Sequence, residues 1–205
     1  PVQFNDINVG LTTTGWELLV NDLDLASSAQ LFLEAGLIPD SAREPLAAAS
    51  ISGTINALSL SGSLFDESVE RVAIDFDDVF VKEDTPFPGI SGLSGSLTLS
   101  GNAGQLQVNS SDLTLGIPTQ FPDPMQLGNV NAIIDFDLTD AQMVIRTERA
   151  AAPADDFEAM ALPTGEFPFS KDSGRSPTLN LVLGSVRAPA SRAMAFTPMP
   201  IEPEA

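Results

Sequence analysis

The sequence predicts a mainly β fold built from antiparallel strands. From residue 50 onward, apolar and polar residues alternate, as in Val72, Ile74 and Phe76. A strand shows this period of two when one of its faces is buried and the other faces water. Gly, Asn, Asp or Pro stands in each gap between the alternating stretches, where the chain must reverse. Small polar residues fill many of the polar positions, which favours exposed sheet faces over helix surfaces.

The order of patterns along the chain predicts one segment without internal domain boundaries. We expect the 205 residues to be a single segment of a longer protein, because the chain opens on mid-chain sequence without an initiator Met. Within it we expect extended chain over residues 2–25, a helical insert over 26–49 and core antiparallel strands over 50–149. A loop excursion is expected over 150–176, followed by a last strand and a frayed tail over 177–205.

The insert is the one stretch with helical signals, and it predicts one or two short helices near residues 27–49. Ser27 to Gln30 has capping-box spacing, and Gly36 is well placed to end a first helix. A second helix is expected to begin near Asp40 or Ser41, although Pro45 would interrupt its hydrogen bonding.

The composition excludes several functional classes. The sequence has no His and no Cys, which removes the commonest general base, thiolate metal sites and the usual catalytic triads. Its two lysines, Lys82 and Lys171, lie in no recognisable motif. A net charge of −19 argues against nucleic acid and against an anionic membrane surface. We therefore expect a protein that is not an enzyme, with no catalytic residues, no cofactor, no metal and no nucleic-acid partner.

Two acidic groups leave calcium binding open as an alternative. One runs from Asp75 to Asp84 and the other from Asp135 to Asp140, and carboxylates at such spacing suit Ca²⁺. Several of these residues alternate with apolar neighbours, so the simpler interpretation places them on the solvent face of strands. A pair of facing carboxylates, as in a glycan-active enzyme, is the third hypothesis, but one Trp and no Tyr leave little aromatic surface for sugars.

Glycine and proline punctuation carries a resemblance to a known family. Residues 87–97 read FPGISGLSGSL, residues 104–111 read GQLQVNSS, and residues 115–127 contain Pro118, Phe121 and Pro124 at characteristic spacing. In this order the motifs resemble the YhdP/AsmA-like family of Gram-negative envelope proteins. The resemblance covers residues 16–145 well, is weaker over 150–174 and returns over 178–200.

The resemblance implies a fold, a place and a function. It implies a strongly twisted, curved antiparallel sheet that forms an elongated apolar groove in a periplasmic protein anchored in the inner membrane. Phospholipid acyl chains would move along that groove between the inner and outer membranes, which the protein would reach through parts outside this segment. The apolar strand faces then supply the lipid-groove residues: Ile74, Phe76, Leu97, Leu99, Leu106, Val108, Leu113, Leu115, Phe136 and Ile145.

The residues alone leave other outcomes open. Strands with one apolar face must bury that face, and about two short helices are few to cover so many strands. The sheet could instead close on itself as a sandwich or barrel. A structural or adhesive extracellular β module, with or without calcium, is then the alternative function.

Overall fold

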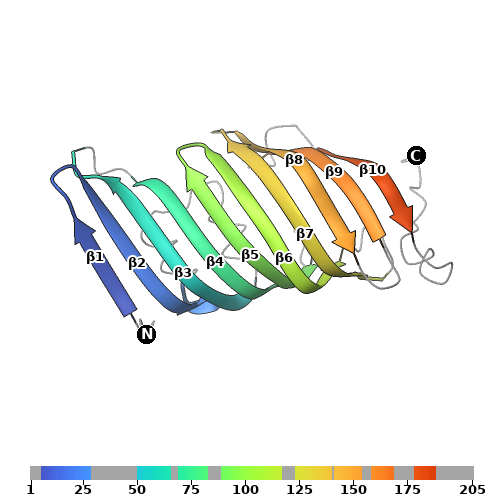
Figure 1. The fold of residues 1–205 in the computed structure, drawn as a ribbon, viewed down its shortest axis with the longest axis horizontal. Coiled ribbons are helices and arrows are strands. Elements are labelled where there is room, and N and C mark those ends of the chain that lie inside the picture. The colour runs from blue at the N-terminus through green and yellow to red at the C-terminus, as the bar shows by residue number, and fades with distance from the viewer. Residues whose placement is uncertain are drawn as a thin grey trace, which may run out of the picture.

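A single ten-stranded antiparallel sheet forms the described part of the chain (Figure 1). The computed structural model describes residues 6–28, 50–65, 69–82, 89–116, 123–139, 141–153, 158–168 and 178–187. Each strand pairs with the next along the sequence, so the order in the sheet is the order in the chain. The strands are β1 (Asp6–Leu11), β2 (Gly15–Asp24), β3 (Ile51–Ser63), β4 (Val69–Val81), β5 (Gly89–Ser100), β6 (Ala103–Gly116), β7 (Met125–Leu138), β8 (Gln142–Pro153), β9 (Glu158–Pro168) and β10 (Thr178–Arg187).

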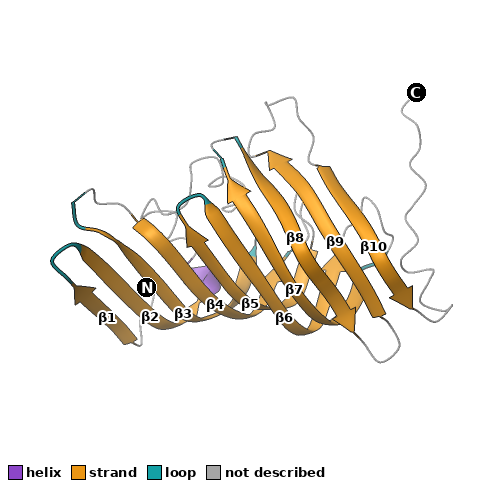
Figure 2. Cartoon of the chain, turned by 45° about the horizontal axis from the view of Figure 1, so that its top comes forward, coloured by secondary structure: helices purple, strands orange, loops and turns teal. Residues whose placement is uncertain are grey.

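The sheet is open. Strands β1 and β10 lie at its opposite ends and do not pair with each other (Figure 1). The predicted mainly β class with antiparallel strands is therefore confirmed, and closure into a sandwich or barrel is wrong for the described strands. The longer strands curve along their length, which gives the sheet a concave and a convex face (Figure 2).

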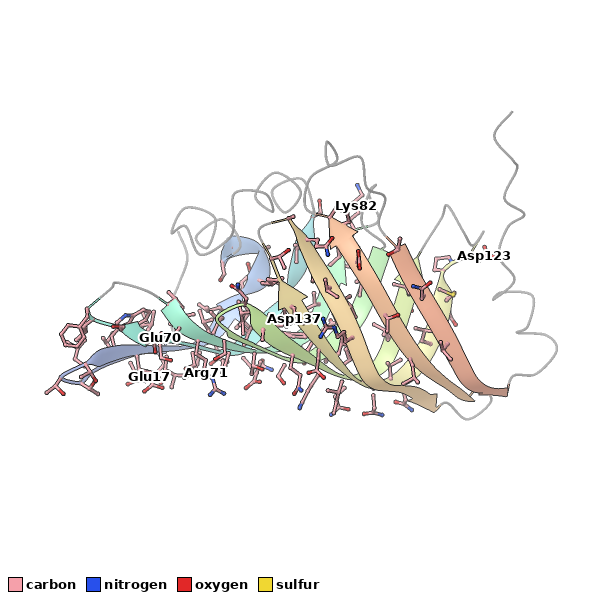
Figure 3. The ribbon with its side chains drawn as sticks, turned by 90° about the horizontal axis from the view of Figure 1, so that it is seen from above. Glu17, Glu70, Arg71, Lys82, Asp123 and Asp137 are labelled. Carbon is pink, nitrogen blue, oxygen red and sulfur yellow. The ribbon has the colours of Figure 1, made fainter. Side chains whose placement is uncertain are left out.

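Most apolar positions of the strands share the concave face, although a few, such as Ile133 and Val144, lie on the other face. Two buried clusters lie on the concave face, one on β2 and β3 and one on β6 and β7. The first contains Val20, Leu23, Ile55, Leu58 and Leu60, and the second contains Val108, Leu113, Val130 and Ala132. Polar side chains stand on the convex face, where Glu17 and Arg71 point away from the sheet (Figure 3). The period of two in the sequence is thus a division between two faces.

One helical turn follows β2 directly. Residues 25–28 are helical, and Leu25 packs against the first buried cluster. Asp24 caps the turn, because the Ser27 N–H donates to its Oδ1 at 2.8 Å while the Ser28 hydroxyl donates to its carbonyl at 2.7 Å. The turn agrees with the start of the predicted insert, and the rest of that prediction, residues 29–49, lies outside the described residues.

The prediction of a loop over 150–176 is wrong where the structure describes this stretch. Strand β8 continues to Pro153, and β9 occupies Glu158–Pro168. Ala150 pairs with Ala161 and Ala151 with Met160, so cross-strand pairing decides the conformation of an alanine-rich stretch whose own strand propensity is low. The tail beyond Arg187 lies outside the described residues.

A line of β-bulges crosses the sheet and marks where the strands bend. Register shifts occur between Ser52 and Thr54 on β3, between Phe76 and Val79 on β4, and between Ser91 and Gly95 on β5. A further shift follows on β6 between Ser110 and Leu113, whereas the shift on β8 opposite Ile133 and Ile134 lies off this line, beside the second apolar row of the sheet. Bulges increase local twist and bend the strand that carries them. We call this line the crease.

Side chains replace part of the backbone ladder at the crease. The Ser94 N–H donates to the Ser110 hydroxyl at 2.9 Å, and that hydroxyl donates back to the Ser94 carbonyl at 3.3 Å. The Ser94 hydroxyl accepts from the Asp78 N–H at 3.1 Å and donates to Asp77 Oδ1 at 2.5 Å. Ser110 is almost fully buried, at 4% exposure, so its two bonds with Ser94 satisfy a hydroxyl group that water does not reach. The crease is a bonded feature, not a break in the sheet.

Glycine is required at Gly95, where β5 passes the crease. Its φ is +156°, and a Cβ there would overlap the carbonyl oxygen of Gln107 on β6. We expect Gly95→Ala to lower the free energy of unfolding by about 3 kcal/mol, because backbone must move to admit the methyl group. Gly10→Ala is the matched control, since its Cβ would make only ordinary contacts, the nearest at 3.8 Å. Urea unfolding of both variants measures the difference, and equal stabilities would contradict this account.

The cap at Asp24 predicts a pH-dependent stability difference. Hydrogen bonds from the Ser27 side chain and backbone N–H lower the pKa of Asp24. A lowered folded-state pKa means that the carboxylate stabilises the fold above the unfolded-state value of about 4 and loses this effect as the pH falls through the folded-state value. Asp24→Ala should therefore cost about 0.5 kcal/mol at neutral pH, the low end for an N-cap because this group is exposed. The difference in unfolding free energy between Asp24→Ala and the unaltered protein should become smaller as the pH falls. A difference that is constant down to pH 2 would show that the ionised carboxylate does not contribute to stability.

Candidate functional site

The concave face carries apolar side chains in rows that cross the strands. The first row follows the paired positions from β2 to β8, in register at each step. It consists of Leu18, Leu60, Val72, Leu99, Gly104, Phe136 and Ile145. Neighbouring strands lie about 4.8 Å apart, so one row is a continuous apolar line across seven strands.

A second row runs parallel to the first, two residues closer to the crease. It consists of Val20, Leu58, Ile74, Leu97, Leu106 and Ile134. We call these two sets the inner rows. No residue in them is charged, and none carries a side-chain hydrogen-bonding group.

Burial divides the inner rows into two zones. On β2 and β3, Val20 and Leu58 are buried within the first cluster, beside the helical turn. From β4 onward, Ile74, Leu97 and Leu99 are only half-buried. Apart from Leu18 on β2, which is also half-buried, the accessible part of the inner rows therefore begins at β4 and extends across the central strands.

The structure brings the ten predicted lipid-groove residues onto one face. Leu99, Phe136 and Ile145 lie in the first inner row and Ile74, Leu97 and Leu106 in the second. Phe76 and Val108 lie in the next row, where Gly95 separates them. Leu113 and Leu115 lie beyond the crease. Whether these residues contact lipid remains a prediction.

Another apolar row lies beyond the crease, and the sequence analysis named only one of its members. Val81, Ile90, Leu115 and Met125 pair in succession across β4 to β7. Their alternation is interrupted by the bulges, so counting by two from the inner rows does not lead to them. The concave-face residues of β2 and β3, by contrast, follow the period of two in the sequence. They could have been predicted from it, but the predicted lipid-groove residues were all taken from β4 to β8.

Phe136 fills a gap in the first inner row. Its partner on β6 is Gly104, and a Cβ on that glycine would overlap the Phe136 ring. The ring therefore lies over the glycine backbone and replaces the missing side chain, an arrangement that stabilises glycine in sheets. The row stays apolar and continuous although one of its positions has no side chain.

Charged groups occupy the convex face. Gln105 Nε2 donates to Asp135 Oδ1 at 2.8 Å, and Arg146 Nη1 lies 3.4 Å from Asp137 Oδ2. These contacts place both aspartates on the solvent side of β7, as the simpler interpretation of the acidic groups expects. Within the described ranges, no three acidic side chains converge as a metal site would require, so the calcium alternative gains no support there.

Lys82, the described lysine, lies exposed just after β4, and its backbone N–H donates to the Ser50 carbonyl at 2.9 Å (Figure 3). The other lysine, Lys171, lies outside the described residues. Among the residues that the structure describes, no helix has the length and apolarity needed to cross a membrane. What this surface offers chemically is apolar contact, without directional bonds, along the inner rows.

Comparison with known proteins identifies one family. The model of the YhdP protein family matches residues 2–205, which is nearly the whole chain. No curated protein and no solved structure matches the chain.

The contact between Phe136 and Gly104 predicts a coupled pair of substitutions. Gly104→Ala should destabilise the fold by about 1 to 3 kcal/mol, because the new methyl group competes with the ring for space. In a Phe136→Ala background the same substitution should be neutral or stabilising, since alanine suits a strand interior better than glycine. A double-mutant cycle by urea unfolding measures this coupling. Additive effects would contradict the placement of the ring.

Proposed function

Because the chain belongs to the YhdP family, a lipid-transport family of the Gram-negative envelope, we propose that it is a non-catalytic segment that guides phospholipid acyl chains along its concave face. The observation that carries this proposal is the unbroken register of the inner rows, the first from β2 to β8 and the second from β2 to β7. A hydrocarbon chain needs a line of apolar contacts and no fixed partner atoms. The inner rows provide such a line.

The direction of the rows suits movement over a distance. They run across the strands, so the surface lengthens with every strand added to the sheet and is not limited by the length of one strand. Each methylene buried against it contributes about 0.8 kcal/mol, and neighbouring positions along the rows offer similar contacts. An acyl chain can then shift from one strand to the next without leaving a single strong site.

The distribution of charged side chains suggests where the lipid headgroup lies. No cation lies in the inner rows, and the described Arg71 and Arg146 belong to convex-face positions. A phosphate would lose its hydration on the concave face without gaining a partner, which is costly. In this proposal the headgroup stays in water while only the acyl chains contact the sheet.

The proposal includes a location. Family membership places the protein in the Gram-negative envelope, and we propose the periplasm, with the inner and outer membranes reached through other parts of an inner-membrane-anchored protein. The adhesive or calcium-binding alternative is not favoured, because it gives no role to a half-exposed apolar face.

A charge in the inner rows should block lipid contact. With the photo-crosslinker p-benzoylphenylalanine at position 136 of the intact protein in cells, we expect phospholipid to be captured. Leu99→Asp, two strands away in the same row, should lower this capture at least about tenfold, because burying a carboxylate against an acyl chain costs several kcal/mol. Mass spectrometry of the captured lipid gives the measurement.

Thr98→Asp is the matched control, since Thr98 neighbours Leu99 on β5 and faces the convex side, in register with Gln105. It should leave capture unchanged. Leu99→Ser adds a polar group without charge and should give an intermediate loss, which guards against misfolding of the aspartate variant. Absence of lipid at position 136 in the otherwise unaltered protein would refute the proposed function.

A further inference from the structure

The second inner row is covered on β2 and β3 but accessible on either side of them. Val20 and Leu58 are each only 3% exposed. The row extends to β1, where Ile7 pairs with Val20 and is 49% exposed. On β4 and β5 it is half-buried, at Ile74 and Leu97. One section of an otherwise accessible apolar row is therefore closed.

Strand pairing alone does not bury the side chains of this section. Leu97 lies in the same row, also with a strand on each side, and it stays half-buried. Deeper burial requires contact from above the concave face. The helical turn Leu25–Ser28 supplies such a contact, because Leu25 packs against the cluster that contains Val20 and Leu58. Ser28 has no exposed surface, so the far end of the turn is buried as well.

The turn contacts the sheet through a side chain that an acyl chain can replace. The hydrogen bonds described for the turn join Ser27 and Ser28 to Asp24, the last residue of β2, so they hold the shape of the turn without fixing it to β3. The contact of Leu25 with the cluster is apolar and has no preferred direction. An acyl chain offers the cluster the same kind of contact, so the two can exchange at little net cost.

We propose that the closed section on β2 and β3 is an acyl-chain site that Leu25 occupies, and that the turn Leu25–Ser28 is a gate on the second inner row. With Leu25 in place, an acyl chain on β4 to β7 does not continue to Ile7 on β1. When an acyl chain displaces Leu25, the row is continuous from β1 to β7. This inference rests on the proposed function, and it adds a step at which passage along the sheet is controlled.

The first test measures access to the closed section without a lipid assay. Leu58→Cys, in a sequence that has no cysteine of its own, is treated with N-ethylmaleimide in the intact protein, and mass spectrometry of the labelled peptide gives the rate. Leu97→Cys, in the same row, is the matched control. We expect Leu58→Cys to react at least about tenfold more slowly than Leu97→Cys, because a buried thiol reacts only while the gate is open.

Leu25→Ala should raise the labelling rate of Leu58→Cys about tenfold, the effect of losing roughly half the burial of one leucine side chain. It should leave the rate of Leu97→Cys unchanged, and Leu25→Met, which keeps a similar volume, should leave both rates unchanged. Equal rates at positions 58 and 97 with Leu25 in place overturn the gate. So does a Leu58→Cys rate that Leu25→Ala does not raise, or a rise at both positions, which would show general unfolding.

The second test places p-benzoylphenylalanine at position 25 or position 136 of the intact protein in cells. We expect phospholipid at both positions, because an acyl chain that displaces Leu25 passes beside it. Position 98 is the control, since Thr98 faces the convex side, and it should capture none. Lipid at 136 but not at 25 overturns the exchange at the gate and leaves the proposed function standing. Absence of lipid at 136 overturns the proposed function and, with it, this inference.

Discussion

The fold depends on register: each strand must pair with the next so that its apolar positions fall on the concave face. A slip of one residue would turn every apolar side chain of a strand to the convex side. In the inner rows no slip occurs over seven strands, and Leu18, Leu60 and Val72 remain in line with Leu99 and Ile145. Burial on β2 and β3 supports this register, because Leu23 and Ile55 are each only 1% exposed. The apolar surface exists because the register is kept.

The crease reconciles that register with curvature. A sheet bends where bulges insert a residue, and a bulge moves the following side chains to the other face unless a second irregularity compensates. On β4 and β5 the shift after Phe76 is reversed before Val81, so Val81 and Ile90 return to the concave side. Ser94 and Ser110 supply the hydrogen bonds that the bulged backbone gives up. The same few residues therefore allow the sheet to curve and keep its apolar face continuous.

The period of two in the sequence was sufficient to predict the strands and the face on which their apolar residues lie. It predicted the antiparallel strands from residue 50 onward and placed Ile74, Leu97 and Phe136 together on one apolar face. It missed β9, because the pairing of Ala150 with Ala161 depends on a neighbouring strand and not on local propensity. It missed the alignment of the bulges for the same reason, since Gly95 meets Gln107 only once β5 and β6 are paired. The family motifs predicted the open, curved sheet. The alternation of apolar and polar residues alone was also compatible with a closed sheet.

Different parts of the sheet require different kinds of residue. On the concave face, one aliphatic side chain can replace another with little change, because contact with hydrocarbon is not directional. At the crease, Gly95 and Ser110 hold backbone geometry and tolerate less. A surface of this kind is specified by the placement of residue classes, and a search for one essential side chain would overlook it.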